Sequence, residues 1–291
     1  MSTNPERLLV IDGGYATHRA YHALAPSKLS RPDGEPIWAL HGFFTSLAKL
    51  VAMRKPTHVL IALDSPGGCP ARRAQLPGYK STRKAPLPEF ASQAKELEIV
   101  LHEAGIPSIA LSGWEADDIV ASAAVVANAA GMECDMFSAD RDLFQLLNGT
   151  TRVVRIDGST FTEDDLLAKY GCSPRQYVEL AAMRGEAADC IEGVPRVGEK
   201  TAMKLLAAFG DFESAIADEV ELARALSPKL AALVVEHADR VRTNISVATL
   251  RRDIEIRLGE FTLPLDRQRL ETTLRAAGLP AAASAMCNTC C

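Results

Sequence analysis

The sequence lacks any apolar run approaching the roughly 18 to 20 residues needed to cross a bilayer. Its first residues, Met1 to Arg7, also lack the charged and apolar regions of a signal peptide. Hydrophobic residues make up 47% and charged residues 24% of the 291 positions, values typical of a globular protein with a substantial core. We therefore expect a cytoplasmic protein with no membrane partner.

The sequence also lacks the paired cysteine spacing of a zinc site. Four of the seven cysteines are scattered, which favours a reducing compartment over a disulfide framework: Cys69, Cys134, Cys172 and Cys190. The other three, Cys287, Cys290 and Cys291, include a CxxC without a second CxxC or a His pair. A disordered tail over residues 281–291 is therefore a better interpretation than a zinc site.

No nucleotide-binding motif is present either. No GxGxxG follows the first expected strand. Gly193 to Thr201 nearly matches the Walker pattern, but Glu199 separates Gly198 from Lys200, and the segment follows a helical stretch where that motif requires a strand. We do not expect a nucleotide cofactor.

Strand-like and helical patterns alternate up to about residue 156, which predicts an α/β fold with a mostly parallel central sheet and helices on both faces. The candidate strands are Leu8–Ile11, His58–Leu63, Ser108–Leu111, Glu133–Ser138 and Arg152–Ile156. Helical patterns then follow at Glu163–Tyr170, Pro174–Arg184, Glu199–Phe209 and Lys229–Val241. These patterns predict an α/β domain over residues 1–165 and a helical subdomain over residues 166–280.

Acidic residues follow several of these strands. Asp12 and Asp64 come directly after the first two, while Glu115-Ala-Asp117-Asp118 and Asp140-Arg-Asp142 follow two others. A single Asp at a strand end is usually a loop residue or a helix cap. Four strand ends of a parallel sheet deliver their carboxylates to one rim, where repulsion must be relieved by protons or cations. Oxygen ligands favour Mg²⁺ or Mn²⁺.

The net charge of −5 conceals a concentration of basic residues. Many of them lie in Ser65–Pro88, a segment rich in Gly, Pro, Arg and Lys with little apolar periodicity. Loops of this length are usually functional or disordered. Basic residues beside a metal site favour a functional, mobile loop or arch spanning about residues 65–90.

A glycine-bounded turn, Gly193 to Gly198, lies between two helical patterns. Such a turn exposes backbone N–H groups at a helix N-terminus, which suits a phosphate, and Lys200 and Lys204 add positive charge. The alternative is an ordinary turn between helices. We expect a helix-hairpin-helix (H3TH) element over residues 185–209.

Taken together, the motifs resemble those of the bacterial 5′ nucleases, the family of the 5′-3′ exonuclease domain of DNA polymerase I and its stand-alone flap endonuclease relatives. The likeness runs from Leu8 to about residue 280. The motifs that carry it, in the order of the family, are Ile11-Asp12-Gly13, Leu63-Asp64, Tyr79-Lys80-Ser81-Thr82-Arg83, Gly113-Trp114-Glu115-Ala116-Asp117-Asp118, Ala139-Asp140-Arg141-Asp142-Leu143, and Gly193-Val194-Pro195 with Lys200-Thr201-Ala202. The resemblance implies a PIN-like core and, because no polymerase region follows, a stand-alone form.

The resemblance also implies two divalent cations held among acidic residues. Those nearer one metal would be Asp12, Asp64, Glu115 and Asp117, and those holding the other would be Asp140, Asp142 and Asp189. Asp118 and Glu186 would act through water or through the other ligands.

The sequence departs from the family between Gly185 and Glu192, where Gly-Asp-Ser-Ser-Asp-Asn-Ile-Pro is typical. Glu186 moves a carboxylate by one methylene, and Ala187 and Ala188 remove hydroxyls near DNA or near a monovalent cation such as K⁺. Gly14-Tyr15 also replaces the usual Ser-Ser after Gly13. We expect retained activity with altered metal affinity or altered preference between exonuclease and flap cutting.

By resemblance, the reaction is hydrolysis of DNA near a 5′ end, giving a 5′-phosphate and a 3′-hydroxyl in replication and repair. Lys80 and Arg83 would act on the scissile phosphate. The residues expected to contact DNA are Arg19, Arg72, Tyr79, Lys80, Arg83, Gly193, Val194, Val197, Gly198, Lys200, Thr201 and Lys204. Substrates would be 5′ flaps and nicked, gapped or 5′-ended duplexes.

Monomer is the default expectation, with nucleoid-associated work beside a separate DNA polymerase and ligase. The alternatives are a DNA-structure-binding homologue with weakened catalysis, for which the altered Glu186–Glu192 stretch argues, and a metal-dependent phosphatase or RNase that uses the same acidic rim.

Overall fold

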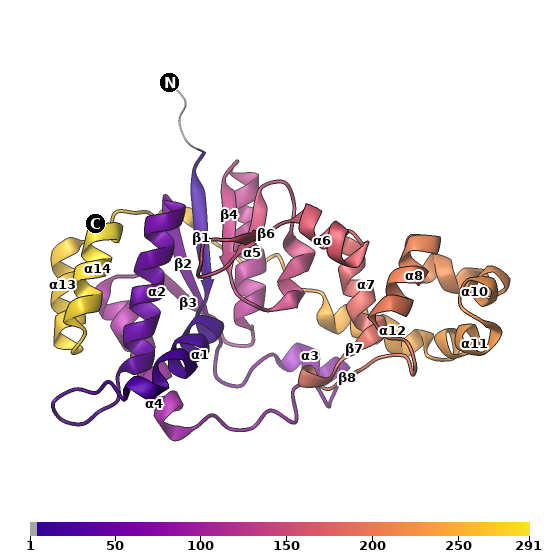
Figure 1. Ribbon diagram of the computed structural model, residues 1–291, viewed down its shortest axis with the longest axis horizontal. Coiled ribbons are helices and arrows are strands. Elements are labelled where there is room, and N and C mark those ends of the chain that lie inside the picture. Colours follow the sequence, from indigo (N-terminus) through magenta and orange to yellow (C-terminus); the bar gives the residue numbers. More distant parts are fainter. Residues whose placement is uncertain (1–4) are drawn as a thin grey trace.

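A single six-stranded sheet forms the centre of the protein (Figure 1). The computed structural model describes residues 5–291. The strand order is β3-β2-β1-β4-β5-β6, and all neighbours pair in parallel except β5 and β6, which are antiparallel. The strands are β1 (Arg7–Asp12), β2 (His58–Leu63), β3 (Ser108–Ala110), β4 (Glu133–Phe137), β5 (Thr151–Val154) and β6 (Thr160–Phe161). The predicted mostly parallel α/β core is confirmed.

Helices cover both faces of the sheet, which explains why its central strands are apolar on both sides. Alternate residues of β1 enter different cores: Leu8 and Val10 pack with helix α5, whereas Leu9 and Ile11 pack with α2 and α4. The helices of this part are α1 (Gly13–Leu24), α2 (Trp38–Arg54), α4 (Pro88–Ala104) and α5 (Ala116–Ala129), with short 3₁₀ turns η1 (Ala25–Ser27) and η2 (Arg141–Leu146).

Short helices make up the second part of the chain, at the right of Figure 1. They are α6 (Glu163–Tyr170), α7 (Pro174–Arg184), α8 (Glu199–Phe209), α9 (Phe212–Ala217), α10 (Glu219–Ala225), α11 (Pro228–Glu236) and α12 (Ala238–Ala248). A small antiparallel ribbon, β7 (Gly185–Glu186) and β8 (Ile191–Glu192), with the turn η3 (Ala187–Asp189), separates α7 from α8. The predicted Lys229–Val241 helix is two helices, because the chain breaks at His237.

The chain ends with two helices that return to the sheet domain. After the turn η4 (Leu258–Phe261), α13 (Arg267–Ala276) and α14 (Pro280–Cys290) pack beside α2 and α4. The prediction of a disordered tail is therefore wrong, as is the extent of the helical subdomain to residue 280. Residues 280–290 form a helix because their apolar residues recur at helical spacing and face the core. The buried residues of this stripe are Ala282, Ala283, Met286, Cys287 and Cys290. None of the helices in residues 5–291 is long and apolar enough to span a bilayer.

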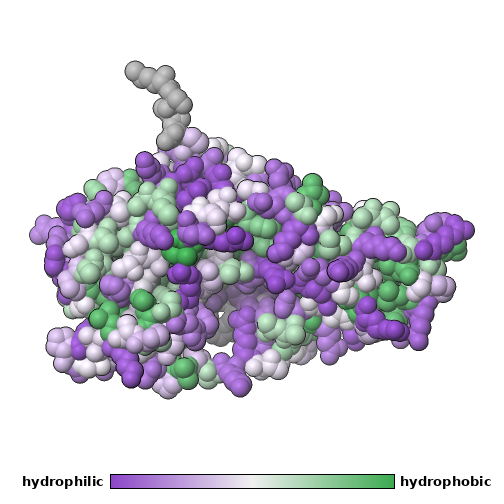
Figure 2. Space-filling model, in the orientation of Figure 1, coloured by the Kyte–Doolittle hydropathy of each residue, from purple (hydrophilic) through white to green (hydrophobic). Residues whose placement is uncertain are grey.

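Residues 65–87 form a bridging segment between β2 and α4, along the lower edge of Figure 1. Its first half is anchored. The short helix α3 (Pro70–Gln75) places the Arg72 side chain in the interior, and Tyr79 packs with Ile191 and Val247 of the helical part. The prediction of a mobile loop is therefore wrong for this half. Figure 2 shows a hollow bordered by hydrophilic side chains above the segment.

Candidate active site

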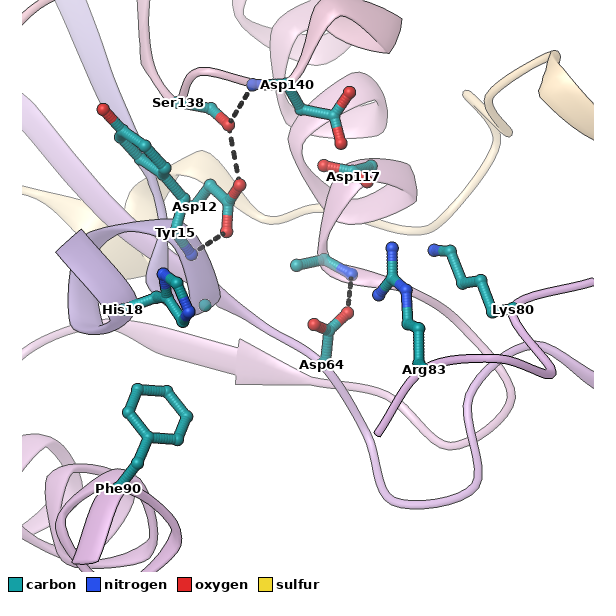
Figure 3. Close-up of a pocket in the computed structure, with 12 residues that line it drawn as sticks. Asp12, Tyr15, His18, Asp64, Lys80, Arg83, Phe90, Asp117, Ser138 and Asp140 are labelled. Atoms are coloured by element: carbon teal, nitrogen blue, oxygen red, sulfur yellow. Dashed lines mark hydrogen bonds between the residues drawn. The ribbon is translucent and has the colours of Figure 1, made fainter. Parts of the chain in front are cut away.

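Carboxylates gather at the carboxyl ends of β1 and β2. Asp12 ends β1 and caps α1, where its Oδ1 accepts the N–H of Tyr15 at 2.9 Å and its Oδ2 accepts the hydroxyl of Ser138 at 2.7 Å (Figure 3). Asp64 follows β2 and accepts the N–H of Ala116, the first residue of α5, at 2.9 Å. Helix starts thus orient both carboxylates through main-chain hydrogen bonds.

Two further elements contribute acids from their first turns. Glu115 is the N-cap of α5, and Asp117 and Asp118 lie in its first turn. Asp140 caps η2, and its Oδ1 accepts the N–H of Asp142 at 2.9 Å. Acidic residues at these positions are stabilised by the partial positive charge of a helix N-terminus, which explains locally why the sequence places them there.

The carboxylates line two adjoining cavities. Asp12, Asp64, Asp117 and Asp140 line an acidic pocket of about 420 Å³, into which Lys80 and Arg83 also project (Figure 3). A narrower cavity beside it is lined by Glu115, Asp117, Asp142 and Asp189, so Asp117 borders both. Within residues 5–291, no three His, Cys, Asp or Glu side chains converge closely enough to hold one ion. The acids therefore share a pocket without meeting at one point.

Burial and mutual repulsion make the pocket unfavourable for negative charge. Burial raises the pKa of Asp12 to about 6; Asp64 and Asp140 add to this, against hydrogen bonds from Tyr15 and Ser138. Burial and the charge of Asp140 raise the pKa of Asp142 to about 7. Burial also raises the pKa values of Asp117 and Asp140. Each of these carboxyl groups is therefore harder to ionise than an ordinary Asp, and added positive charge would favour its ionised form.

Glu115 has the opposite environment. Burial disfavours its charge, but Lys80, Arg72 and the hydroxyl of Tyr79 together lower its pKa. Lys80 Nζ donates to Oε1 of Glu115 at 2.5 Å, and Tyr79 Oη donates to Oε2 at 2.9 Å. Glu115 is therefore an ionised carboxylate whose oxygens are already engaged by the bridging segment.

Arg72 lies beneath this cluster, with only 6% of the residue exposed. Its guanidinium binds Asp118 through two hydrogen bonds of 2.9 and 2.7 Å, donates to Glu115, and donates from Nε to the carbonyl of Val247 at 2.9 Å. Asp118 is fully buried and lines neither cavity. Because Arg72 and Tyr79 are both buried and bound to Glu115, the structure does not support the prediction that these two side chains contact DNA.

Lys80 and Arg83 are held by the loop that carries Asp189. Lys80 adopts a left-handed backbone conformation with φ of 55°, and its N–H donates to the carbonyl of Asp189 at 3.0 Å. Arg83 Nη2 donates to Oδ1 of Asp189 at 2.8 Å. A non-glycine residue in this conformation is strained, and such strain is concentrated at functional sites.

Glu186 lies at the margin of the site. Arg184 Nη2 donates to its carboxylate at 3.1 Å, and 44% of the Glu186 side chain is exposed. Glu186 lines neither cavity, although its charge contributes to the raised pKa of Asp142. The neighbouring Ala187 and Ala188 are exposed and offer no side-chain oxygen.

The turn between α7 and α8 depends on its first glycines. A Cβ on Gly193 would lie 2.4 Å from the carbonyl carbon of Arg184, and one on Gly185 would lie 2.4 Å from the nitrogen of Gly193. A Cβ on Gly198 would instead meet nothing within 4 Å, and Gly198 begins α8 without a side-chain cap. Gly193 thus serves internal packing, while Gly198 leaves the start of α8 open to an external group.

The other residues predicted to contact DNA are divided between surface and interior. Lys200 and Lys204 are exposed on α8, and Arg19 and Thr201 are partly exposed. Val194 and Val197 are buried, so only their main chain is available to a ligand.

Four pocket residues were not predicted as site residues from the sequence, although Tyr15 was noted as a departure from the family. Ser138, Tyr15, His18 and Phe90 line the acidic pocket, with the rings of His18 and Phe90 meeting edge to face at 5.7 Å. Ser138 could have been found from the sequence, because it lies two residues before the predicted site residue Asp140. His18 and Phe90 meet only through the packing of α1 against α4, for which the sequence offers no local sign.

The fold is a resolvase-like, PIN-like α/β core joined to a helical SAM-fold domain. The family model described as "5′-3′ exonuclease, N-terminal resolvase-like domain" matches residues 7–171, and "5′-3′ exonuclease, C-terminal SAM fold" matches residues 172–271. The chain therefore belongs to the 5′-3′ exonuclease family.

Sequence relatives include DNA polymerase I of Bacillus caldotenax, 34% identical over 87% of this chain and 29% of the relative. The thermostable DNA polymerase I of Thermus aquaticus is 34% identical over 92% of this chain and 31% of the relative. The chain thus spans about three-tenths of the length of these relatives.

Solved structures share the fold. The T5 5′-exonuclease with bound divalent zinc ions superimposes with a TM-score of 0.68 at 18% identity, covering 98% of this chain and 100% of the other. The catalytic core of Rad2 in complex with DNA substrate gives a TM-score of 0.60 at 14% identity, covering 99% and 93%.

Proposed function

We propose that the protein is a structure-dependent 5′ nuclease that hydrolyses DNA phosphodiesters near 5′ ends and at 5′ flaps, giving a 5′-phosphate and a 3′-hydroxyl. The observation that carries this proposal is the acidic pocket, in which carboxylates from separate strand ends face Lys80 and Arg83. Family membership and the resemblance of its motifs support the same reaction.

The chemistry of the acidic residues suits a pair of divalent cations, although no three of these side chains converge on one point in residues 5–291. The donors are carboxylate oxygens, which favour Mg²⁺ or Mn²⁺, and the raised pKa values of Asp12 and Asp142 indicate a need for positive charge. The residues that would hold the ions are Asp12, Asp64, Glu115, Asp117, Asp140, Asp142 and Asp189. Glu186 and Asp118 would act indirectly, through water or through the other ligands. When bound, such ions would supply an activated water and would stabilise the leaving oxygen.

The side chains of the bridging segment provide the remaining positive charge. Lys80 and Arg83 are ion-paired with Glu115 and Asp189, two of the carboxylates proposed to bind metal. Both cations border the acidic pocket, where they would face a scissile phosphate. Their role is to neutralise charge that develops on its oxygens.

The start of α8 would bind the duplex at a distance from the phosphodiester that is cut. Gly198 leaves the helix N-terminus accessible, and Lys200 and Lys204 lie one helical turn apart on its exposed surface. These groups contact phosphates without reading sequence. A monovalent cation such as K⁺ near this turn would be held by main-chain oxygens, because Ala187 and Ala188 lack side-chain donors.

The chain is proposed to act as a monomer on flapped, nicked, gapped and 5′-ended DNA. The similarity to DNA polymerase I suggests cooperation with a DNA polymerase, and nick products suit a ligase.

The function is tested with a 5′-labelled flap duplex. Wild type with Mg²⁺ or Mn²⁺ is expected to cut near the junction, whereas Asp140→Ala and wild type in EDTA are expected to leave the flap intact. Tight flap binding without cleavage in either metal would favour the alternative, a DNA-structure-binding homologue with weakened catalysis, which the Glu186–Glu192 departures support. Hydrolysis of p-nitrophenyl phosphate without flap cutting would indicate a phosphatase.

The raised carboxylate pKa values also predict how stability depends on pH. Asp12 and Asp142 have folded-state pKa values of about 6 and 7, above the ordinary 3.8. Between these limits the folded state binds more protons than the unfolded state, so stability is lost as pH rises through 6 to 7. Without divalent cations, the melting temperature should fall by roughly 3–6 °C from pH 5 to pH 8.

Circular dichroism melts with and without Mg²⁺ measure this effect. Mg²⁺ should raise the melting temperature more at pH 8 than at pH 5, and Asp12→Asn with Asp142→Asn should flatten the pH dependence. A metal-free melting temperature that rises over this range would contradict the prediction.

A further inference from the structure

A second cavity, of about 330 Å³, adjoins the acidic pocket. Its lining includes Tyr15, Ser138, Arg141, Phe144, Arg155 and Lys169, contributed by α1, the β4–η2 loop, the β5–β6 turn and α6. Tyr15 and Ser138 also line the acidic pocket, so the two cavities share a wall. We call this cavity the basic pocket.

Cations outnumber acids in the lining of the basic pocket. Arg141 has Glu199 at 4.0 Å, and no carboxylate oxygen in residues 5–291 lies within 4.0 Å of a side-chain nitrogen of Arg155 or Lys169. The one acid in the lining, Asp157, accepts hydrogen bonds from the N–H and hydroxyl of Ser159 at 2.9 and 2.7 Å. Three cations facing one cavity suit an anionic ligand.

The pocket is built on a rigid aromatic base. Phe144 stacks on Phe161 with ring centres 4.6 Å apart, and Lys169 Nζ lies 5.1 Å from the ring centre of the buried Tyr170. Arg155 lies at the β5–β6 turn, which its own main chain closes through hydrogen bonds with Ser159 and Gly158. Packing fixes this base and the main chain of the turn, whereas the side chains of Arg141, Arg155 and Lys169 are exposed and accessible to a ligand.

Tyr15 connects the basic pocket to the proposed chemistry. Its N–H orients Asp12, while its ring packs on Phe137 at 5.3 Å and is directed away from Asp117 and Asp140 (Figure 3). An aromatic ring at this wall can stack on a sugar or a base. The replacement of the family's usual Ser by Tyr15 therefore gives the basic pocket an aromatic face.

We infer that the basic pocket binds a backbone phosphate of the DNA strand that occupies the acidic pocket, with the Tyr15 ring against the adjoining nucleoside. This inference rests on the proposed function. A strand that leaves the acidic pocket past Tyr15 and Ser138 enters the basic pocket directly, where Arg141, Arg155 and Lys169 replace its counterions. The basic pocket thus adds affinity without base recognition.

The test begins with equilibrium binding of a flap duplex in EDTA, where hydrolysis cannot intervene. Arg155→Ala combined with Lys169→Ala should reduce the slope of log K against log salt by about 1 to 2 and weaken binding on the order of tenfold. The matched control is Lys49→Ala combined with Lys95→Ala, which removes two exposed lysines of α2 and α4 outside both pockets. Equal slopes for the two double variants would overturn the inference.

A second measurement identifies the contacted phosphate. Neutral methylphosphonate linkages are placed one at a time around the flap junction. At one or two positions, wild type should lose affinity, whereas Arg155→Ala with Lys169→Ala should lose none further, because the contact is already absent. Additive losses at every position would exclude a direct contact. Tyr15→Phe should bind like wild type, and Tyr15→Ala should bind more weakly; equal binding by these two variants would remove the ring from the proposal.

These outcomes are separable from failure of the proposed function. Wild type that cuts the flap in Mg²⁺ together with an unaffected double variant would reject the basic pocket alone. Wild type that binds with the predicted salt slopes but cuts under no condition would reject the nuclease reaction and retain the phosphate contact.

Discussion

Lys80→Ala is expected to reduce turnover on a 5′ flap by about 10²–10³-fold, which is the scale for removing one charge-stabilising donor from an active site. The Kd for the flap should change no more than severalfold, because Lys80 is one of several cations proposed to contact DNA, among them Lys200 and Lys204. Its Nζ lies 2.5 Å from Oε1 of Glu115 and borders the acidic pocket, so the lost charge is local to the reacting phosphate.

Two controls separate chemistry from general electrostatics. Lys84→Ala removes an exposed lysine of the same bridging segment and should leave turnover within severalfold of wild type. Lys80→Arg keeps the charge on a longer side chain and should recover part of the activity. Single-turnover rates with saturating enzyme and independent Kd measurements distinguish the two effects. Unchanged turnover for Lys80→Ala would remove this side chain from the mechanism.

Arg72→Ala is expected to lower the free energy of unfolding by about 3–5 kcal/mol, the cost of removing one partner from a buried ion pair. Asp118 is fully buried and accepts two hydrogen bonds from Arg72, so it would remain as an uncompensated charge. Glu115 would lose a neighbour as well. We expect turnover to fall with stability, since the start of α5 carries three acids of the site.

The adjacent Arg73 supplies a matched control, because it is exposed on the same short helix. Arg73→Ala should alter urea unfolding little. Combining Arg72→Met with Asp118→Asn should be less destabilising than the sum of the single changes, since the stranded charge is removed with its partner. Strictly additive losses would show that the pair does not interact. If Arg72→Ala instead weakens DNA binding without loss of stability, the original assignment to DNA contact would be restored.

The sheet and the positions of the acids could be predicted from the sequence because both depend on local patterns. Apolar runs such as His58–Leu63 form strands buried on both faces, and parallel strands place the residues that follow them at one edge. Asp12, Asp64 and Asp140 accordingly lie around one pocket. The α7–turn–α8 element was also predictable, because glycine spacing and helical periodicity occur within a short stretch.

What could not be predicted depends on contacts between distant segments. Arg72 is indistinguishable in sequence from its neighbour Arg73, yet one is buried against Asp118 and Val247 and the other is exposed. The apolar stripe of α14 is buried only because the end of the chain packs against α2. The basic pocket likewise combines residues from α1, η2, the β5–β6 turn and α6, and of its three cations only Arg141 lies in one of the motifs named above.

The Arg72 contacts join segments of the chain that are synthesised far apart in time. The guanidinium is anchored to the carbonyl of Val247, and the main chain of Arg251 donates to Asp118 at 2.9 Å. Until that region has left the ribosome, Arg72 lacks the carbonyl that anchors it beside Glu115 and Asp118. We therefore expect a nascent chain to complete the arrangement around Glu115 and Asp118 late, after most of the helical domain has been synthesised. A chain truncated before residue 247 would keep every acid of the site but would lack the carbonyl that anchors Arg72.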